Sequence, residues 1–280
     1  MSAPFNAVQV RYSAAGNGKV AVIDTIDAFA EYYSGYTGRD RWDYSWMGGL
    51  TRSQAILAAR NGHQPSVASS DEYMGKFEEL AFQARKWTTV DAVAGGAPNV
   101  GAYLAGSPVS MRRRQRVMND FAPLTIFLDV VSSGGISAEY LKKRGAAVLA
   151  LVRMLGATRP VQLYAVGGLG GRRNGYIMVK MPEVADLGRS AFMMAHPAAA
   201  RGMLYACAHR VEEGVKGSWA FHSVEAYRHN GLKIYAEAIG APEADCLYVP
   251  PPYLGEQDLV PEKWLPEMLA KYGAAATDND

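Results

Sequence analysis

The clearest hydrophobic pattern lies in the second half of the chain. Residues 124–131 (LTIFLDVV) form a continuous apolar run that carries one acid, Asp129, and such a run is typical of a strand buried on both faces. A turn at residues 132–135 follows, and apolar side chains then recur at helical spacing as far as Leu155. The pattern predicts a strand–turn–helix unit over residues 124–155, with Asp129 at the end of the strand.

Two further strands are expected after this unit. The runs 161–166 (VQLYAV) and 176–181 (YIMVKM) are separated by nine residues, 167–175 (GGLGGRRNG). This separation is shorter than the crossover that parallel strands need, so it predicts an antiparallel hairpin with a glycine-rich loop. Helices are then expected over residues 187–195, 197–213, 225–239 and 261–272, and a short strand over 246–249.

The first third is expected to be mostly helical after a short extended start. Residues 19–24 (KVAVID) have a strand pattern, and Thr25 and Thr51 are placed to cap two helices. A longer helix is predicted over residues 70–87. Residues 88–110 are rich in glycine and proline, which predicts a loop-rich connector with one short helix and a domain boundary.

These elements predict an α/β protein. Its sheet is expected to be mainly parallel, with one antiparallel edge hairpin, helices on both faces and a helical N-terminal extension. Residues 1–110 would form a mostly helical region packed on the core, residues 111–273 the α/β domain, and residues 274–280 a flexible tail.

Composition excludes several classes of protein. Apolar residues make up 49% and charged residues 20%, which is normal for a globular chain, and the formal charge of +2 does not by itself predict nucleic-acid binding. We find neither a secretory signal in the first ten residues nor an apolar run long enough to span a membrane. We therefore expect a cytoplasmic protein without a membrane partner. The two cysteines, Cys207 and Cys246, leave free thiols and a disulfide both open.

Local charge is more informative than net charge. Four guanidinium groups, those of Arg112, Arg113, Arg114 and Arg116, fall within five residues. They repel one another unless they are solvated or paired with anions, and phosphate is their usual bidentate partner. This cluster therefore predicts either a nucleic-acid contact or a solvated surface.

The glycine-rich loop adds a second basic element, Arg172 and Arg173. Glycines let backbone amides approach a phosphate closely, but the loop lacks the Gly-x-x-x-x-Gly-Lys-Ser/Thr pattern of a nucleotide P-loop. If both basic elements lie on one face, Trp87, Tyr103 or Tyr176 are candidates for stacking on bases.

The order strand, acidic turn, helix, strand, hairpin resembles the start of a von Willebrand factor A-like domain. In that family the first strand ends in Asp-x-Ser-x-Ser, which holds a magnesium ion (Mg2+). Here the segment reads Asp129-Val130-Val131-Ser132-Ser133, and the first serine is displaced by one residue. The resemblance implies a degenerate Mg2+ site at Asp129, Ser132 and Ser133. The alternative is that Asp129 caps the turn and the serines bond to the backbone.

The chain also resembles a group of phage-encoded proteins of unknown function over residues 25–215. This resemblance implies an origin and carries no assigned activity. It rests on four segments: Trp46 to Thr51 leading into Ala55, Ala58, Ala59 and Gly62; Leu104 to Met111; Arg144 to Ala147; and Ala195 to Pro197 with Arg201.

The remaining candidate chemistry is sparse. The chain has no Gly-x-Ser-x-Gly elbow and no His-Glu-x-x-His motif, and His222 and His229 alone do not make a metal site. An enzyme is thus less favoured than a non-catalytic protein. An aromatic segment is either a binding surface or a set of anchors for the N-terminal helices. It contains Tyr32, Tyr33, Tyr36, Trp42, Tyr44 and Trp46.

The sequence therefore favours a non-catalytic phage protein acting in a nucleic-acid transaction in the host cytoplasm, with its basic clusters contacting phosphate. Its partner would be nucleic acid or a phage or host protein. Two alternatives stay open. One is a virion or assembly scaffold that forms homo-oligomers through the aromatic segment, and the other is a magnesium-dependent site at Asp129.

Overall fold

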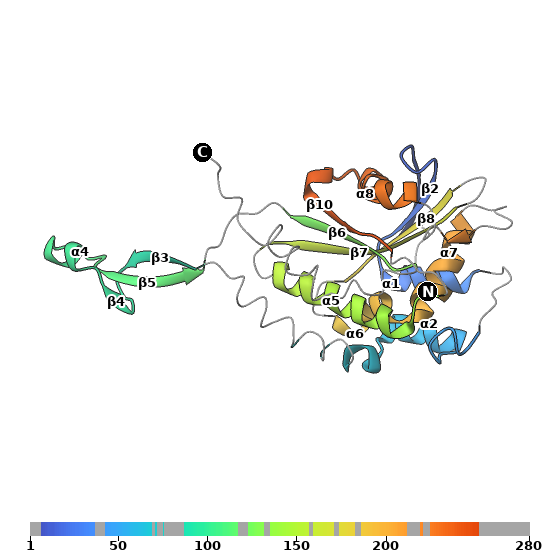
Figure 1. Cartoon of the computed structure of the whole chain (residues 1–280), viewed down its shortest axis with the longest axis horizontal. Coiled ribbons are helices and arrows are strands. Elements are labelled where there is room, and N and C mark those ends of the chain that lie inside the picture. Colours follow the sequence, from blue (N-terminus) through green and yellow to red (C-terminus); the bar gives the residue numbers. More distant parts are fainter. Residues whose placement is uncertain are drawn as a thin grey trace.

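The structure is a computed structural model in which most elements surround one large sheet (Figure 1). The described residues are 7–36, 43–68, 71, 75, 87–116, 123–131, 135–156, 159–170, 174–182, 186–211, 219–220 and 225–251. The main sheet has seven strands in the order β1-β2-β8-β7-β6-β10, with β9 paired to β7. These strands are β1 (Val8–Ser13), β2 (Gly18–Ile23), β6 (Leu124–Asp129), β7 (Val161–Gly170), β8 (Asn174–Lys180), β9 (Trp219–Ala220) and β10 (Cys246–Val249).

The strand and the helix of the predicted unit are confirmed, as is the antiparallel pairing of the two strands after it. Strand β6 is followed by helix α5 (Ala138–Gly156), and β7 returns parallel to β6 while β8 runs antiparallel to β7. The predicted loop at 167–175 is wrong in its extent, because β7 continues through Gly170 and pairs with β8. Gly167 lets β7 pack closely against Val131, since a Cβ there would lie 2.3 Å from Cγ2 of Val131.

The predicted edge position of the hairpin and the helical N-terminal extension are both wrong. The chain begins with an antiparallel hairpin, β1–β2, and β2 pairs in parallel with β8, so β8 is an interior strand. Residues 20–23 of β2 are all buried, so this strand is covered on both faces. A short apolar run marks a strand but does not say where in a sheet that strand lies.

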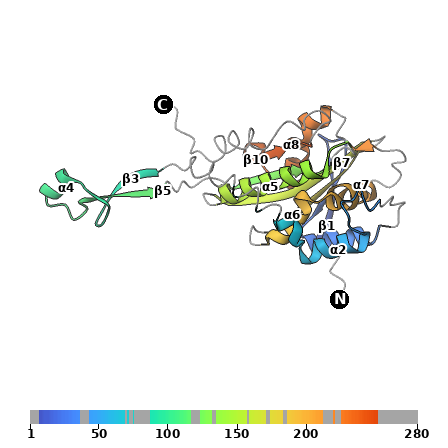
Figure 2. The ribbon, with the colours of Figure 1, turned by 60° about the horizontal axis from the view of Figure 1, so that its bottom comes forward.

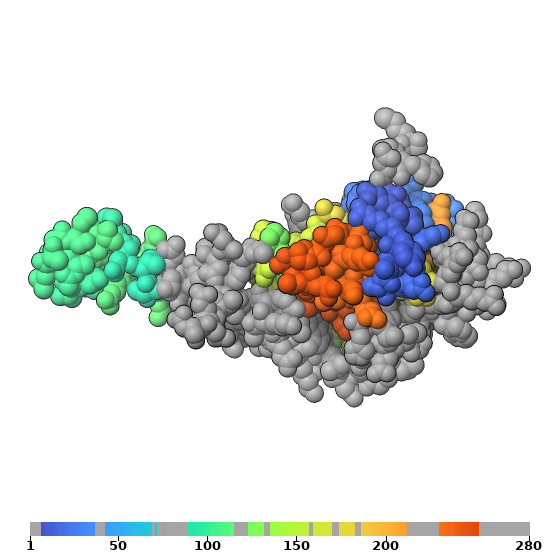
Figure 3. All heavy atoms as spheres, turned by 90° about the horizontal axis from the view of Figure 1, so that it is seen from above, coloured from blue at the N-terminus to red at the C-terminus, as the bar shows by residue number. Residues whose placement is uncertain are grey.

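Helices cover both faces of the main sheet, as predicted. On one face lie α1 (Ile26–Ser34), α2 (Arg52–Asn61), α5, α6 (Leu187–Ala195), the π-helix η2 (Ala198–Leu204) and α7 (Tyr205–Val211). On the other lies α8 (Glu225–Ile239), followed by the short η4 (Glu243–Asp245) that leads into β10. Figure 3 shows α8 beside the N-terminal hairpin, where Ser13 Oγ donates to Glu237 Oε2 at 2.8 Å.

Local capping explains where these helices begin. Thr25 Oγ1 accepts from Ala28 N at 3.1 Å, and Thr51 and Gln54 form a reciprocal capping box at the start of α2. Asp186 likewise accepts from Arg189 N at the start of α6. These three helix starts agree with the sequence prediction.

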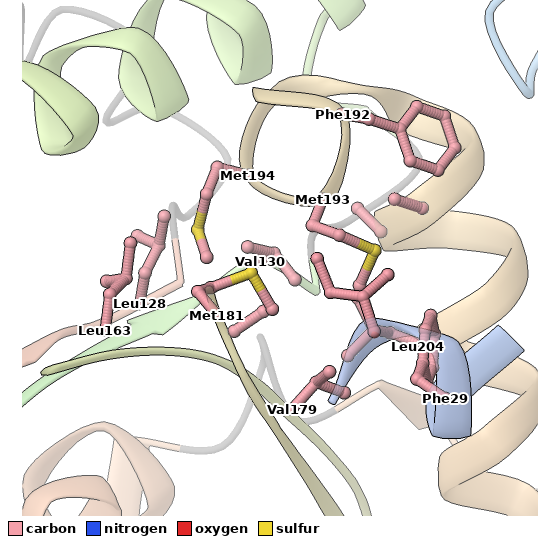
Figure 4. Close-up of a cluster of buried hydrophobic side chains, with 14 of the residues drawn as sticks. Phe29, Leu128, Val130, Leu163, Val179, Met181, Phe192, Met193, Met194 and Leu204 are labelled. Carbon is pink, nitrogen blue, oxygen red and sulfur yellow. The ribbon is translucent and has the colours of Figure 1, made fainter. Parts of the chain in front are cut away.

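The larger core lies between the sheet and the helix layer that contains α5 and α6. Leu128, Leu163 and Val179 from the sheet lie on the side of α6 that carries Met193 and Met194 (Figure 4). Helices α5 and α6 pack unusually closely, because a Cβ on Gly145 would lie 2.4 Å from the carbonyl oxygen of Met194.

A second, three-stranded sheet consists of β3 (Trp87–Ala92), β5 (Met111–Arg116) and β4 (Ala97–Pro98), and carries helix α4 (Val100–Leu104). We call residues 87–116 the arm. Figure 1 and Figure 2 both show the arm apart from the main sheet. The predicted short helix is confirmed, but the loop-rich connector contains two strands, and the boundary expected at residue 110 falls inside this sheet. The prediction missed β5 because an arginine-rich strand lacks the alternation of apolar and polar residues.

Candidate nucleic-acid interface

The strand geometry of β5 divides the arginine cluster between two faces. Successive side chains of a strand point to opposite faces, so Arg112 and Arg114 share one face and Arg113 lies on the other. All three side chains are exposed. Residues two apart on a strand are about 7 Å apart. We call the face with Arg112 and Arg114 the basic face, and Arg116 lies two positions further along the same strand.

Only one carboxylate of the arm faces these arginines. Asp91 lies opposite Arg112 in the register, with 4.0 Å between Asp91 Oδ1 and Arg112 Nε and more than half of each side chain exposed. An ion pair this exposed contributes at most about 1 kcal/mol. Asp91 also accepts from Asn99 Nδ2 at 3.1 Å. The basic face thus retains most of its positive charge.

The positive charge of Arg114 is less compensated by nearby negative charge than that of Arg112. Its partner across the sheet is Thr89, which carries no charge. Within the described part of the chain, neither Arg113 nor Arg114 forms an ion pair. Residues 87–116 contain four arginines and one aspartate, and no other charged residue. The arm is therefore a concentrated positive charge on an extended scaffold.

The second basic element, Arg172 and Arg173, lies outside the described residues. Of the stacking candidates, Tyr103 is 71% exposed on α4, whereas Tyr176 is buried in the main sheet. Its hydroxyl donates to Gly16 O at 2.8 Å, and burial raises the pKa of Tyr176. The expectation that Tyr176 stacks on a base is therefore wrong.

Asp129 lies fully buried at the carboxyl end of β6. Its Oδ1 accepts from Val131 N at 3.1 Å and its Oδ2 accepts from Tyr248 Oη at 3.2 Å. A side chain that accepts from the amide two residues ahead stabilises a turn. Asp129 thus forms the turn contact that the alternative to the magnesium site described.

A buried arginine lies at the same end of the sheet. Arg144 of α5 donates to the backbone oxygens of Asp129, Val249 and Pro250, and so joins the end of β6 to the end of β10. Burial lowers the pKa of Arg144, while Tyr140, Asp129 and Tyr248 oppose that change. A guanidinium group stays charged in proteins. This cation lies where a doubly wound sheet usually offers a ligand crevice, between the strands at which the chain reverses its direction of winding.

The structure contains no group of three or more histidine, cysteine, aspartate or glutamate side chains placed to hold a metal ion, as far as its described residues go. Ser132 and Ser133, the other expected magnesium ligands, lie outside those residues, as do the side chains of His222 and His229. The magnesium site stays a prediction. Cys207 and Cys246 are both buried free thiols, so the disulfide alternative is wrong.

The sequence analysis missed one pair of neighbouring histidine side chains. His63 and His196 meet edge to face with 4.9 Å between ring centroids. Nδ1 of His196 accepts from Ala198 N at 3.1 Å, and His63 Nδ1 lies 2.8 Å from Ser66 Oγ. Burial, with the charges of His63 and Lys142, lowers the pKa of His196 to about 3. His196 lies in a segment that carries the phage resemblance, but no local signal in the sequence pointed to its contact with His63.

The aromatic segment is largely used within the chain. Tyr33 is buried beneath Arg52, with 4.8 Å between the guanidinium carbon and the ring centroid. Tyr32 and Trp46 likewise lie beneath guanidinium groups of α7 and η2. These contacts support the anchoring alternative for the three rings, whereas Tyr44 is 58% exposed. Trp42 lies outside the described residues.

Comparisons with known proteins give one match. A family model described as "Domain of unknown function (DUF7192)" matches residues 6–276. No curated protein and no solved structure matches the chain. Among the described helices, none combines the length and apolar character needed to cross a bilayer.

Proposed function

Since the chain belongs to the DUF7192 family, whose description assigns no activity, we propose from its own geometry that it is a non-catalytic nucleic-acid-binding protein. Its arm contacts the phosphate backbone through the basic face, that is through Arg112 and Arg114. The proposal includes the phage origin and host-cytoplasm location that the sequence suggested.

One observation carries this proposal: the arm has concentrated charge and no core. None of its described side chains is buried. A two- or three-stranded sheet without a packed face is marginally stable in water, so the arm gains most from a partner that covers it. Because this segment contains four arginines and only one aspartate, the partner of the basic face is an anion.

The shape of the arm favours a nucleic acid over a small anion. Arginines about 7 Å apart along a strand match a ligand whose negative charges repeat along a line. Strands of β-ribbon and β-sheet proteins bind duplex DNA in its major or its minor groove. Guanidinium groups bind phosphate in a bidentate manner, which fixes the register of such a ribbon.

The main sheet then serves as the platform for the arm, and we propose that it is von Willebrand A-like. Its strand order β8-β7-β6-β10, with β8 antiparallel to β7, supports this relationship. The added β1–β2 hairpin beyond β8 departs from that pattern. Arg144 of α5 supplies a fixed cation at the end of β6.

The test uses the two neighbouring arginines as a matched pair. Arg114→Gln and Arg113→Gln remove the same charge from adjacent positions on opposite faces of β5. Binding of the full chain to a fluorescently labelled DNA duplex is measured by anisotropy at low salt. Arg114→Gln should weaken binding about tenfold, which corresponds to about 1.4 kcal/mol, and Arg113→Gln by about twofold at most. Absence of binding by the wild type, or an equal loss in both variants, would refute the proposal.

A further inference from the structure

The end of the arm is uncharged and apolar. Residues 92–111 contain no aspartate, glutamate, lysine or arginine. Five of the ten large hydrophobic side chains exposed among the described residues lie here, which is far more than scattered exposure explains. We call these five the apolar tip: Val93 at 75% exposure, Val100 at 61%, Tyr103 at 71%, Leu104 at 79% and Val109 at 37%.

This exposure is built into a hydrogen-bonded turn. Asn99 Oδ1 accepts from Ala102 N at 3.3 Å and caps α4, and Asn99 N donates to Ser110 O at 2.8 Å. Ser107 N donates to Ala102 O at 2.9 Å, and Gly106 has a φ of +71°, a value that favours glycine. The backbone therefore presents Tyr103 and Leu104 outward on a defined scaffold.

We infer that the apolar tip is a wedge. It inserts between base pairs of the duplex that the basic face binds, and it thereby bends the duplex. The inference rests on the proposed function. Proteins that bind the minor groove frequently insert apolar side chains between base steps and bend the duplex, and the unstacking they cause is offset by the additional surface that the bent duplex brings into contact. Tyr103 adds an aromatic ring that stacks on bases of any sequence.

The distribution of charge along the arm favours this occupant over a membrane. A bilayer reached by the tip would meet the arm end-on, so the arginines would lie progressively further from the anionic headgroups. The Cα positions 112 and 116 are about 13 Å apart along a strand, which exceeds the screening length at physiological salt. A duplex lying alongside the arm instead meets the basic face and the tip together.

Charge also disfavours a second copy of the chain. Two arms that covered each other's basic face would bring together two segments with four arginines and one aspartate each, and contact through the tips alone would leave that face without an anion. Like charges placed across an interface are repulsive and suppress association. Among the three occupants, only duplex nucleic acid supplies negative charge for the basic face and stacking surfaces for the tip.

The experiment compares two exposed leucines. Leu104→Ser alters the tip, and Leu57→Ser alters α2, where the side chain is 55% exposed. The full-length variants are first compared by circular dichroism to confirm the fold. A duplex with a donor and an acceptor dye at its ends reports bending by energy transfer, and anisotropy of the same duplex reports binding.

The wild type should raise the energy transfer at saturation, and Leu57→Ser should behave like it. Leu104→Ser should still bind with salt dependence but lose about half or more of the energy-transfer change, since an inserted side chain determines the kink. Wild-type binding without bending, or equal bending by Leu104→Ser, would overturn the inference and leave the proposed function standing. Absence of any binding would instead refute the proposed function.

Two further measurements exclude the other occupants. Sedimentation with vesicles that contain an anionic phospholipid should show no binding by the wild type, and light scattering should show the same molar mass for the wild type and Leu104→Ser. Vesicle binding that Leu104→Ser abolishes would overturn the inference in favour of a membrane. Dimers that Leu104→Ser abolishes would overturn it in favour of a second copy.

Discussion

Replacement of Arg144 by methionine tests how the carboxyl ends of β6 and β10 are held together. Methionine keeps much of the length of arginine but removes all its donors. The substitution leaves three backbone oxygens without their Arg144 hydrogen bonds, those of Asp129, Val249 and Pro250. It also leaves the Asp129 carboxylate, which is fully buried, without its neighbouring cation.

The magnitude follows from the one-sided loss. Removing the donor leaves buried acceptors with their desolvation penalty, which costs about 1–3 kcal/mol for each group. Whole proteins are stable by about 5–15 kcal/mol, so Arg144→Met should remove a third or more of the total. Asp129→Asn should cost less in the Arg144→Met background than in the wild type. We expect a coupling of about 2 kcal/mol between the two positions, within the range found for contacting residues.

Urea unfolding of the four proteins in this cycle, followed by far-ultraviolet circular dichroism, measures the coupling. The wild type, the two single variants and the double variant are compared at one pH and salt concentration. A coupling smaller than about 0.5 kcal/mol would mean that the two positions act independently. That result would refute the account of Arg144 as the cation that compensates Asp129.

Two further substitutions test the packing and the histidine pair. Gly145→Ala should destabilise the protein by about 1–3 kcal/mol in urea unfolding, because the added methyl group meets the backbone of Met194 at 2.4 Å. Gly156→Ala, in the same helix with nothing within 4 Å of the added Cβ, should be neutral or slightly stabilising, and equal effects would contradict this packing. The pKa of His196 is lowered from 6.5 to about 3, so its neutral form stabilises the fold above pH 6.5, and that contribution is lost as the pH falls from 6.5 toward 3. At pH 5 the free energy of unfolding should be lower by about 2 kcal/mol. The urea midpoint of a His196→Gln variant should therefore decline less between pH 6.5 and 5 than that of the wild type. Equal declines of the two midpoints would refute the linkage.

Much of the fold was predictable where the signal is local. The apolar run of β6, the periodic stripe of α5 and the caps at Thr25, Thr51 and Asp186 depend on residues a few positions apart. The place of β2 in the sheet was not predictable, because it is set by pairing with β8, where Val20 lies opposite Tyr176. That pairing depends on the tertiary fold and leaves no mark on β2 itself.

The candidate site shows the same division. The arginine cluster was visible in the sequence, but its separation into two faces follows from β5 being a strand, which the sequence did not indicate. The role of Arg144 depends on an oxygen of Val249, which is 105 residues away. The apolar tip was hidden in a segment whose glycines and prolines predicted a simple connector. Its exposure depends on how the arm stands apart from the main sheet (Figure 2).

The salt dependence of DNA binding tests the central claim most directly. If Arg112 and Arg114 each neutralise one phosphate, the logarithm of the binding constant should fall against the logarithm of salt concentration with a slope of about −1.8. Arg114→Gln should reduce the magnitude of that slope by about 0.9, while Arg113→Gln should leave it nearly unchanged. A slope near zero, or no binding at low salt, would contradict the account of the arm as a phosphate-binding strand.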